Sequence, residues 1–217
     1  MFGREKIAII IGEFLGVAVL TSSILAMTGR TDFPFFSAIA AGLAMGLMTI
    51  LLAPHSGGHI NPAVTIGLWT LKKVETTVAV VMIAAQMLGG LAAWRLNEYF
   101  LNTKLSDTAG KTFNWRVFVA EAVGTFVFTW GVAAAVSRKY EAGMKAVVVG
   151  GSLLLGILVA SFASNGILNP AVAAGVRSWS WAYATAPIVG SIVGMNLYTM
   201  VFEAAPAKSK NRGSRKK

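Results

Sequence analysis

The sequence contains no cysteine, so disulfide bonds, thiolate metal ligands and thiol nucleophiles are excluded. Charge is also scarce, because Asp, Glu, Lys and Arg make up 13% of the 217 residues, whereas a soluble domain carries about a quarter. Histidine occurs only at His55 and His59, and neither has an acidic neighbour, which argues against a metal site. We therefore expect no bound metal, no cofactor and no water-facing globular surface.

Long uncharged apolar runs fill most of the chain, of which 55% is hydrophobic. A helix needs about 20 apolar residues to cross the hydrocarbon core of a bilayer. Six runs reach that length: Ile7–Met27, Phe36–Ala53, Thr76–Leu96, Val117–Val136, Met144–Phe162 and Trp181–Val201. These runs predict an all-α membrane protein with six transmembrane helices.

The basic residues between the runs predict the orientation. With the N-terminus in the cytoplasm, 13 of the 19 Lys and Arg residues lie on the inside, so the positive-inside rule favours cytoplasmic termini. Six of those residues belong to the tail 204–217, which follows the last run directly. Anionic lipid is the nearer partner for such a tail, and nucleic acid is not expected.

Two apolar segments, Pro62–Leu71 and Pro170–Val176, are too short to cross the membrane. Ten residues of helix cover about 15 Å, which is about half of the hydrocarbon core. Asn61 and Asn169 immediately precede these segments, and each segment begins with Pro-Ala. Asn is a preferred helix N-cap and Pro is favoured at the first helical position. Both segments are therefore expected to be half-helices that begin at membrane depth.

The two halves of the chain are related by a repeat with an offset of 108 residues. Asn169 follows Asn61 at this offset, and Glu121 follows Glu13 at the same offset. The repeats span about 5–101 and 113–203 within one channel domain, 1–217. Three spans per repeat is an odd number, so the second copy must enter the membrane from the opposite side. Non-helical backbone at mid-membrane is tolerated only inside protein or beside a watery cavity, so we expect a pore between the halves.

Over about residues 5–203, the sequence resembles the aquaporin (major intrinsic protein) family. The resemblance rests on the segment 59–65, on the second Asn-Pro-Ala at 169–171, on Glu13 and Glu121, and on Gln86. It implies an inverted-repeat bundle that conducts water or small neutral solutes passively, excludes protons and ions, and is not an enzyme. It also implies a homotetramer in a cell membrane with one pore per protomer.

The resemblance assigns roles to individual residues. The pore centre would be formed by Asn61, Pro62, Ala63, Asn169, Pro170 and Ala171. The carbonyl groups that line the pore would belong to Gly57, Gly58, His59, Asn165, Gly166 and Ile167. Glu13, Glu121 and Gln86 would support the two loops that precede the motifs, the first loop before Asn61 and the second loop before Asn169.

The outer constriction departs from the family pattern. Water-specific members carry Arg directly after the second motif, where this chain has Val172. The other constriction positions correspond to Ala41, Ile157 and Gly166, in place of the usual aromatic residue, His and small residue. The expected selectivity filter is therefore small to apolar, which favours passage of glycerol, urea, ammonia or gases as well as water.

Three other functions remain open from the sequence. An intramembrane enzyme would need a nucleophile with a base, but the only histidines precede the first motif. A proton-coupled secondary transporter would use Glu13 and Glu121, since inverted repeats and broken helices also occur in transporters. A non-conducting structural member of the same fold would have a closed filter.

Overall fold

The structure is a computed structural model that describes residues 3–27, 34–138 and 140–203. The described residues form α-helices and connecting segments without a β-strand. The six long helices are α1 (Arg4–Met27), α2 (Pro34–Leu52), α4 (Thr76–Leu101), α5 (Trp115–Ser137), α6 (Ala142–Ala160) and α8 (Trp181–Phe202). The two short helices are α3 (Pro62–Thr70) and α7 (Pro170–Gly175). The basic tail 204–217 lies outside the described residues.

The six long helices are each long and apolar enough to cross a membrane. The expected all-α architecture of six spans and two half-helices is confirmed, and most helix ends lie within three residues of the expected positions. The exception is α4, which continues five residues beyond the expected end at Leu96. The last turn of α4 is not part of the apolar run, and the helix is capped by Asn102, whose φ of 49° places the backbone in the left-handed region.

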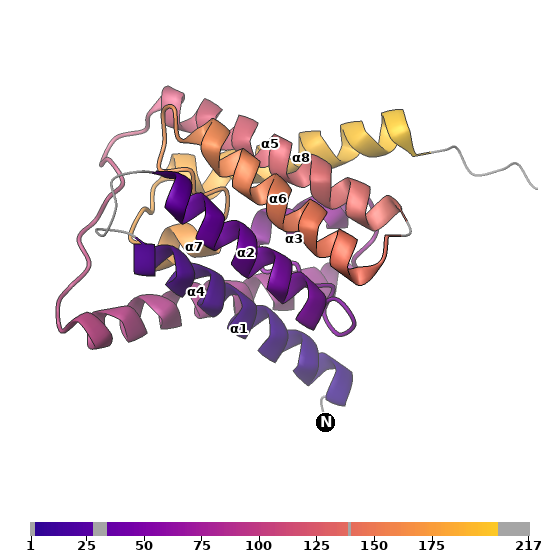
Figure 1. Cartoon of the computed structure of the whole chain (residues 1–217), viewed down its shortest axis with the longest axis horizontal. Coiled ribbons are helices and arrows are strands. Elements are labelled where there is room, and N and C mark those ends of the chain that lie inside the picture. The colour runs from indigo at the N-terminus through magenta and orange to yellow at the C-terminus, as the bar shows by residue number, and fades with distance from the viewer. Residues whose placement is uncertain (1–2, 28–33, 139, 204–217) are drawn as a thin grey trace, which may run out of the picture.

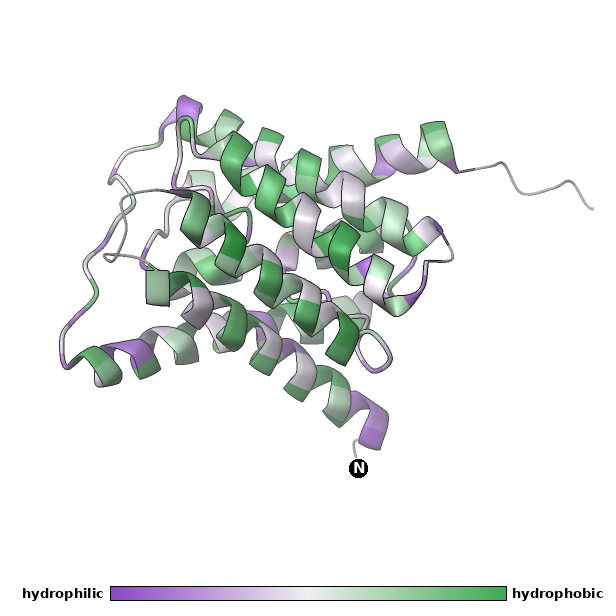
Figure 2. Ribbon diagram, in the orientation of Figure 1, coloured by the Kyte–Doolittle hydropathy of each residue, from purple (hydrophilic) through white to green (hydrophobic). Residues whose placement is uncertain are grey.

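Apolar residues, coloured green in Figure 2, predominate along the long helices. In α1, Ile11, Leu15 and Val19 follow one another at four-residue spacing and are between 42% and 51% exposed. The opposite face of α1 is buried and carries the small or polar residues Gly12 and Glu13. This pattern suits a helix that faces lipid outside and close-packed neighbours inside.

The helix contacts repeat in the two halves of the chain. In the first half, α1 packs against α2 and α4; in the second half, α5 packs against α6 and α8. Each half-helix also packs against the third span of the other half, because α3 contacts α8 and α7 contacts α4. Gly67 in α3 lies against Met195 in α8, and Gly175 in α7 lies against Gly90 in α4. The halves are therefore interlocked as an inverted repeat.

The two halves meet closely where α2 crosses α6. A Cβ atom on Gly42 would lie 2.8 Å from the carbonyl oxygen of Gly150 and 3.1 Å from Leu154 Cβ. Such a distance is too short for a real side chain, so only glycine permits this approach. The spacing between α2 and α6 is thus determined by the absence of a side chain.

Figure 1 shows the start of α1 and the end of α8 at one end of the bundle. The α2–α3 and α5–α6 connections lie at this same end, which we call the termini end. The long connection 102–114 lies at the opposite end, which we call the loop end. The half-helices α3 and α7 approach each other from these two ends.

Candidate functional site

The two half-helices begin at asparagine N-caps in the middle of the bundle. Asn61 has extended backbone (φ −160°, ψ 121°), and its Oδ1 accepts a hydrogen bond from Ala63 N at 2.8 Å. Asn169 is similar (φ −151°, ψ 110°), and its Oδ1 accepts from Ala171 N at 3.0 Å and from Val172 N at 3.3 Å. In both motifs the carboxamide oxygen is therefore occupied by the helix, while the carboxamide nitrogen is directed elsewhere.

Each Asn binds the loop of the other repeat. Asn61 Nδ2 donates to the carbonyl oxygen of Leu168 at 2.9 Å, and Asn169 Nδ2 donates to the carbonyl oxygen of Ile60 at 2.9 Å. The two motifs, 108 residues apart, are thereby brought into direct contact. A carboxamide carries two N–H donors, so one donor remains on each Asn after these bonds are made. Asn61 and Asn169 are 1% and 2% exposed.

Ile60 and Leu168, the residues before the two asparagines, have left-handed backbone with φ values of 39° and 56°. This conformation costs about 1–3 kcal/mol for a residue with a side chain, and Ile60 is β-branched. The strained geometry lets each residue offer its N–H to a buried glutamate and its C=O to the opposite Asn. The strain is thus offset by bonds on both sides of the residue.

Glu13 has no exposed surface, and its side chain holds the first loop by hydrogen bonds. Its carboxylate accepts from Ser56 Oγ at 2.6 Å, His59 N at 3.1 Å, Ile60 N at 2.7 Å and Gln86 Nε2 at 2.6 Å. A carboxylate has about four lone-pair sites, so the acceptor capacity of Glu13 is filled.

Glu121 holds the second loop in the same way, also with no exposed surface. Its carboxylate accepts from Ser164 Oγ at 2.7 Å, Ile167 N at 2.9 Å and Leu168 N at 2.7 Å. The position that would correspond to Gln86 in this repeat is Gly194, so Glu121 has one donor fewer than Glu13.

Gln86 and Thr65 extend the support of the first loop toward His59. Gln86 Nε2 donates to Thr65 Oγ1 at 2.9 Å, and His59 Nδ1 lies 3.2 Å from the same hydroxyl. Thr65 Oγ1 also donates to the carbonyl oxygen of Asn61 at 3.1 Å. One hydroxyl therefore couples the orientation of the His59 ring to the first turn of α3.

Of the four residues expected to form the selectivity filter, three are buried in the apolar core and the fourth, Gly166, contacts one of them. Ala41, Ile157 and Val172 belong to one buried apolar cluster, with exposed fractions of 0%, 4% and 0%. Gly166 has φ of 62°, and a Cβ atom there would lie 3.1 Å from Ile157 Cγ2. Gly166 and Ile157 are thus direct neighbours, and no side chain separates them.

Arg177 is the basic residue nearest to Val172 in the sequence, but its side chain points away from this cluster. Its guanidinium lies 4.4 Å from the ring centroid of Trp94 in α4 and forms an ion pair with Asp107 at 2.5 Å. Its carbonyl oxygen accepts from Thr108 N at 2.8 Å. Arg177 therefore fastens the 102–114 connection and does not supply a charge in place of Val172.

A cavity of about 290 Å³ opens at the termini end, and we call it the termini-side vestibule. Gly57, Gly58 and His59, which were expected to line the pore, lie in its wall. The remaining lining residues are Met45, Thr49, Ala53, Val64, Leu68, Lys73, Val74, Val132, Ala135, Val136, Lys145 and Val149. The vestibule therefore leads from one end of the bundle to the loop that precedes Asn61.

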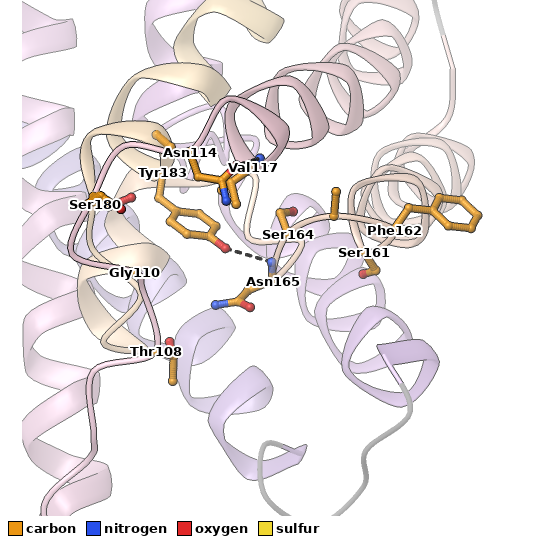
Figure 3. A pocket seen from close by; sticks show the side chains of 13 residues that line it. Thr108, Gly110, Asn114, Val117, Ser161, Phe162, Ser164, Asn165, Ser180 and Tyr183 are labelled. Carbon is orange, nitrogen blue, oxygen red and sulfur yellow. Dashed lines mark hydrogen bonds between the residues drawn. The ribbon is translucent and has the colours of Figure 1, made fainter.

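A second cavity of about 410 Å³ lies at the loop end (Figure 3). Ser164 and Asn165, which directly precede Gly166, form part of its wall, together with Tyr183 at the start of α8. Tyr183 Oη accepts a hydrogen bond from Asn165 N at 2.9 Å, drawn as a dashed line in Figure 3. Hydroxyl and amide groups dominate this wall, so the cavity suits polar uncharged molecules.

Several residues of this site were not predicted to belong to it. Ser56 and Ser164 each follow their glutamate by 43 residues, and this equal spacing was a usable signal for the hydrogen bonds that they make. Thr65, Lys73 and Lys145 left no comparable signal, because their roles depend on contacts between elements that are distant in sequence.

Known proteins are similar to this chain in sequence and in fold. Residues 2–202 match the family model described as major intrinsic protein. Aquaporin NIP6-1 of Arabidopsis thaliana is 30% identical over 92% of this chain and 68% of its own length. Glycerol uptake facilitator protein 3 of Lactiplantibacillus plantarum is 26% identical over 91% of this chain and 96% of its own length.

A solved structure, the aquaglyceroporin from Plasmodium falciparum, matches 90% of this chain and 96% of its own with a TM-score of 0.75 at 23% identity, and it supports the fold. The sequence match covers the repeats, both Asn-Pro-Ala motifs and the six spans. The chain therefore belongs to the major intrinsic protein family.

Proposed function

We propose that this protein is a passive transmembrane channel for water and small neutral solutes. The observation that carries the proposal is the pair of hydrogen bonds by which Asn61 and Asn169 bind opposite loops, each with one N–H donor left over. A water molecule between them would accept from both carboxamides and donate to neither. Its hydrogens would then point away from the centre in both directions, so a chain of waters could not relay a proton.

The filter of Ala41, Ile157, Gly166 and Val172 determines the class of solute in this proposal. It offers neither a fixed cation nor an aromatic wall, so apolar parts of a solute meet apolar side chains there. We assign glycerol, urea, ammonia and dissolved gases to the permeant class together with water. Carbonyl groups of Gly57, Gly58, His59, Asn165, Gly166 and Ile167 would provide acceptors along the path.

The filled acceptor capacity of Glu13 argues against proton coupling. A proton on this carboxylate would displace one of four hydrogen bonds that hold the first loop. An unfilled carboxylate beside the permeant would suit a transporter better. The channel is therefore the better account of Glu13.

One observation favours a non-conducting structural member as the second candidate. Ala41 and Val172 have no exposed surface in this structure, so a water-sized sphere reaches neither of these two proposed filter side chains. In the channel proposal, thermal motion of the filter side chains opens this constriction. Flux measurements separate the two candidates directly.

We further propose a homotetramer with four separate pores in the plasma membrane, with both termini in the cytoplasm. The apolar outer faces of α1, α2, α5 and α6 provide surface for neighbouring protomers as well as lipid. The excess of basic residues on the termini side supports the orientation.

Stopped-flow light scattering on proteoliposomes tests the function. Vesicles are first shrunk with sorbitol, which reports water flux, and then with glycerol or urea, which reports solute entry by reswelling. The expected result is reswelling that is faster than in protein-free vesicles, linear in solute concentration and insensitive to a proton ionophore. Saturating, ionophore-sensitive uptake would instead support a transporter, and rates equal to those of protein-free vesicles would support the structural candidate.

A further inference from the structure

The termini-side vestibule has an unbalanced charge. Lys73 and Lys145 line it, and among the described residues of its wall there is no carboxylate. Lys145 lies in the first turn of α6, and Lys73 lies in the turn after α3. They therefore reach the cavity from different halves of the chain.

Only one of the two lysines has an acidic partner among the described residues. Lys73 Nζ lies 3.7 Å from Glu203 Oε1 at the end of α8, so its charge is partly compensated. Lys145 belongs to none of the ion pairs of the described residues and is partly buried. The nearby Arg138 is directed to α8, where its Nε donates to Tyr198 Oη at 3.1 Å. Lys145 is therefore the uncompensated cation of the vestibule.

The cavities at the two ends of the bundle differ in the charge of their linings. At the offset of 108 residues, the counterparts of Lys145 and Lys73 are Ser37 and Trp181, which carry no charge. The described residues that line the cavity at the loop end are likewise uncharged. Val172 stands at the position where the resemblance expects Arg, so the filter adds no positive charge.

The walls around Lys145 are apolar, and include Val132, Val136 and Val149. Apolar walls have a low dielectric constant and focus the field of a charge into the aqueous space that they enclose. A cation entering the vestibule must approach this field, whereas a neutral solute of equal size feels little of it. The barrier acts in series with any barrier at the two asparagines.

We propose that Lys145, assisted by Lys73, is a charge-selectivity residue that excludes cations at the termini end, in place of the arginine absent from the filter. This inference rests on the proposed channel function. It assigns the rejection of cations to a different end of the path and to residues outside both Asn-Pro-Ala motifs.

Urea and guanidinium form a matched pair of probes, because both are small and planar and only guanidinium is charged. The experiment measures the uptake ratio of radiolabelled guanidinium to urea in proteoliposomes that contain the full chain. Protein orientation in the vesicles does not matter, because a barrier in series acts in both directions. The variants are K145E, K145Q and K145R, with K111Q at the loop end as the control for loss of one positive charge.

The expected uptake ratio rises about tenfold in K145E, which corresponds to about 1.4 kcal/mol of barrier. It rises less in K145Q and stays at the wild-type value in K145R and K111Q. The increase in K145E over wild type should shrink with added KCl, because the screening length falls from about 30 Å at 0.01 M salt to about 3 Å at 1 M.

An equal ratio in K145E, K145Q and wild type would overturn the inference while urea uptake still supports the channel. An equal increase in K111Q would also overturn it, because the effect would then depend on overall charge. If K145E does not fold, the comparison of K145Q with K145R decides in the same way. Urea uptake by wild type no faster than in protein-free vesicles would overturn the channel itself, and the inference with it.

Discussion

Asn61 donates a hydrogen bond to the carbonyl oxygen of Leu168, a residue that lies 107 positions further along the chain. The mirror bond joins Asn169 to Ile60. Each carboxamide therefore has two roles: its oxygen caps a half-helix and one N–H binds the opposite loop, while its second N–H remains as a donor. The centre of the path is built from both repeats and cannot be formed by either alone.

The first prediction concerns these asparagines. N61A and N169A each remove an N-cap, worth about 1 kcal/mol, and a buried hydrogen bond whose loss costs about 1–3 kcal/mol. We expect the thermal unfolding of both variants in detergent, followed by tryptophan fluorescence, to shift down by the equivalent of about 2–4 kcal/mol. N114A is the matched control, since Asn114 caps α5 by accepting from Arg116 N but lies at an exposed position. Equal shifts in all three variants would contradict the importance of the cross-loop bonds.

The second prediction compares the two buried glutamates. A Gln substitution replaces one acceptor oxygen with an NH₂ donor. In E13Q, the NH₂ group would face two hydrogen-bond donors in either orientation of the amide. The reason is that each carboxylate oxygen of Glu13 accepts two hydrogen bonds. In E121Q, one orientation of the amide places the NH₂ group opposite a single donor, Leu168 N.

We therefore expect E13Q to lower the free energy of unfolding by at least about 1 kcal/mol more than E121Q. Thermal unfolding in detergent measures the difference. A larger loss in E121Q would mean that Gln86 does not strengthen the support of the first loop.

The third prediction concerns the filter. V172R places a long charged side chain in the proposed filter of Ala41, Ile157, Gly166 and Val172, so it should lower urea and glycerol flux about tenfold while water flux persists. Stopped-flow reswelling and shrinking of the same vesicles measure both rates. V159A, on the outer face of α6, is the control and should change neither rate. Unchanged solute entry in V172R would show that Val172 does not face the path.

The fourth prediction tests the close approach of α2 and α6. G42A places a methyl group where only 2.8 Å separates it from the carbonyl oxygen of Gly150, so we expect a loss of about 1–3 kcal/mol in thermal unfolding. The neighbouring Gly151 has no atom within 4 Å of a Cβ placed there. G151A should therefore be neutral or stabilise by up to about 1 kcal/mol, since Ala favours helix. Similar losses of stability in G42A and G151A would mean that they come from the change in backbone flexibility and not from the close approach of α2 and α6.

Local chemistry explains why much of the fold could be predicted from the sequence. Apolar runs locate the spans because length and hydrophobicity decide membrane insertion, and Asn-Pro-Ala locates the half-helices because Asn and Pro have positional preferences at a helix start. The end of α4 was predicted five residues too early, because its last turn lies outside the apolar run. Hydropathy indicates where lipid contact ends, which is not where the helix ends.

The side-chain partners could be predicted only in part, because they depend on tertiary contacts. Glu13 and Gln86 were both expected to support the loops, but the sequence did not show that Gln86 donates directly to Glu13. For Ser56, the only signal was its spacing from Glu13, which Ser164 repeats with Glu121. The ion pair of Arg177 with Asp107 could not be predicted, because it depends on the course of the 102–114 connection. The entry of Lys145 into the vestibule depended on the crossing of α2 and α6.

The contacts of α3 with α8 and of α7 with α4 have a consequence for the repeat as a unit. A polypeptide carrying one repeat alone would have a half-helix without its receiving surface and an asparagine without a carbonyl to bind. It would complete this architecture only by pairing with a second copy inserted upside down. Fusion of two such copies into one chain makes that pairing intramolecular, and it also frees each half to diverge, as Gln86 opposite Gly194 and Lys145 opposite Ser37 illustrate.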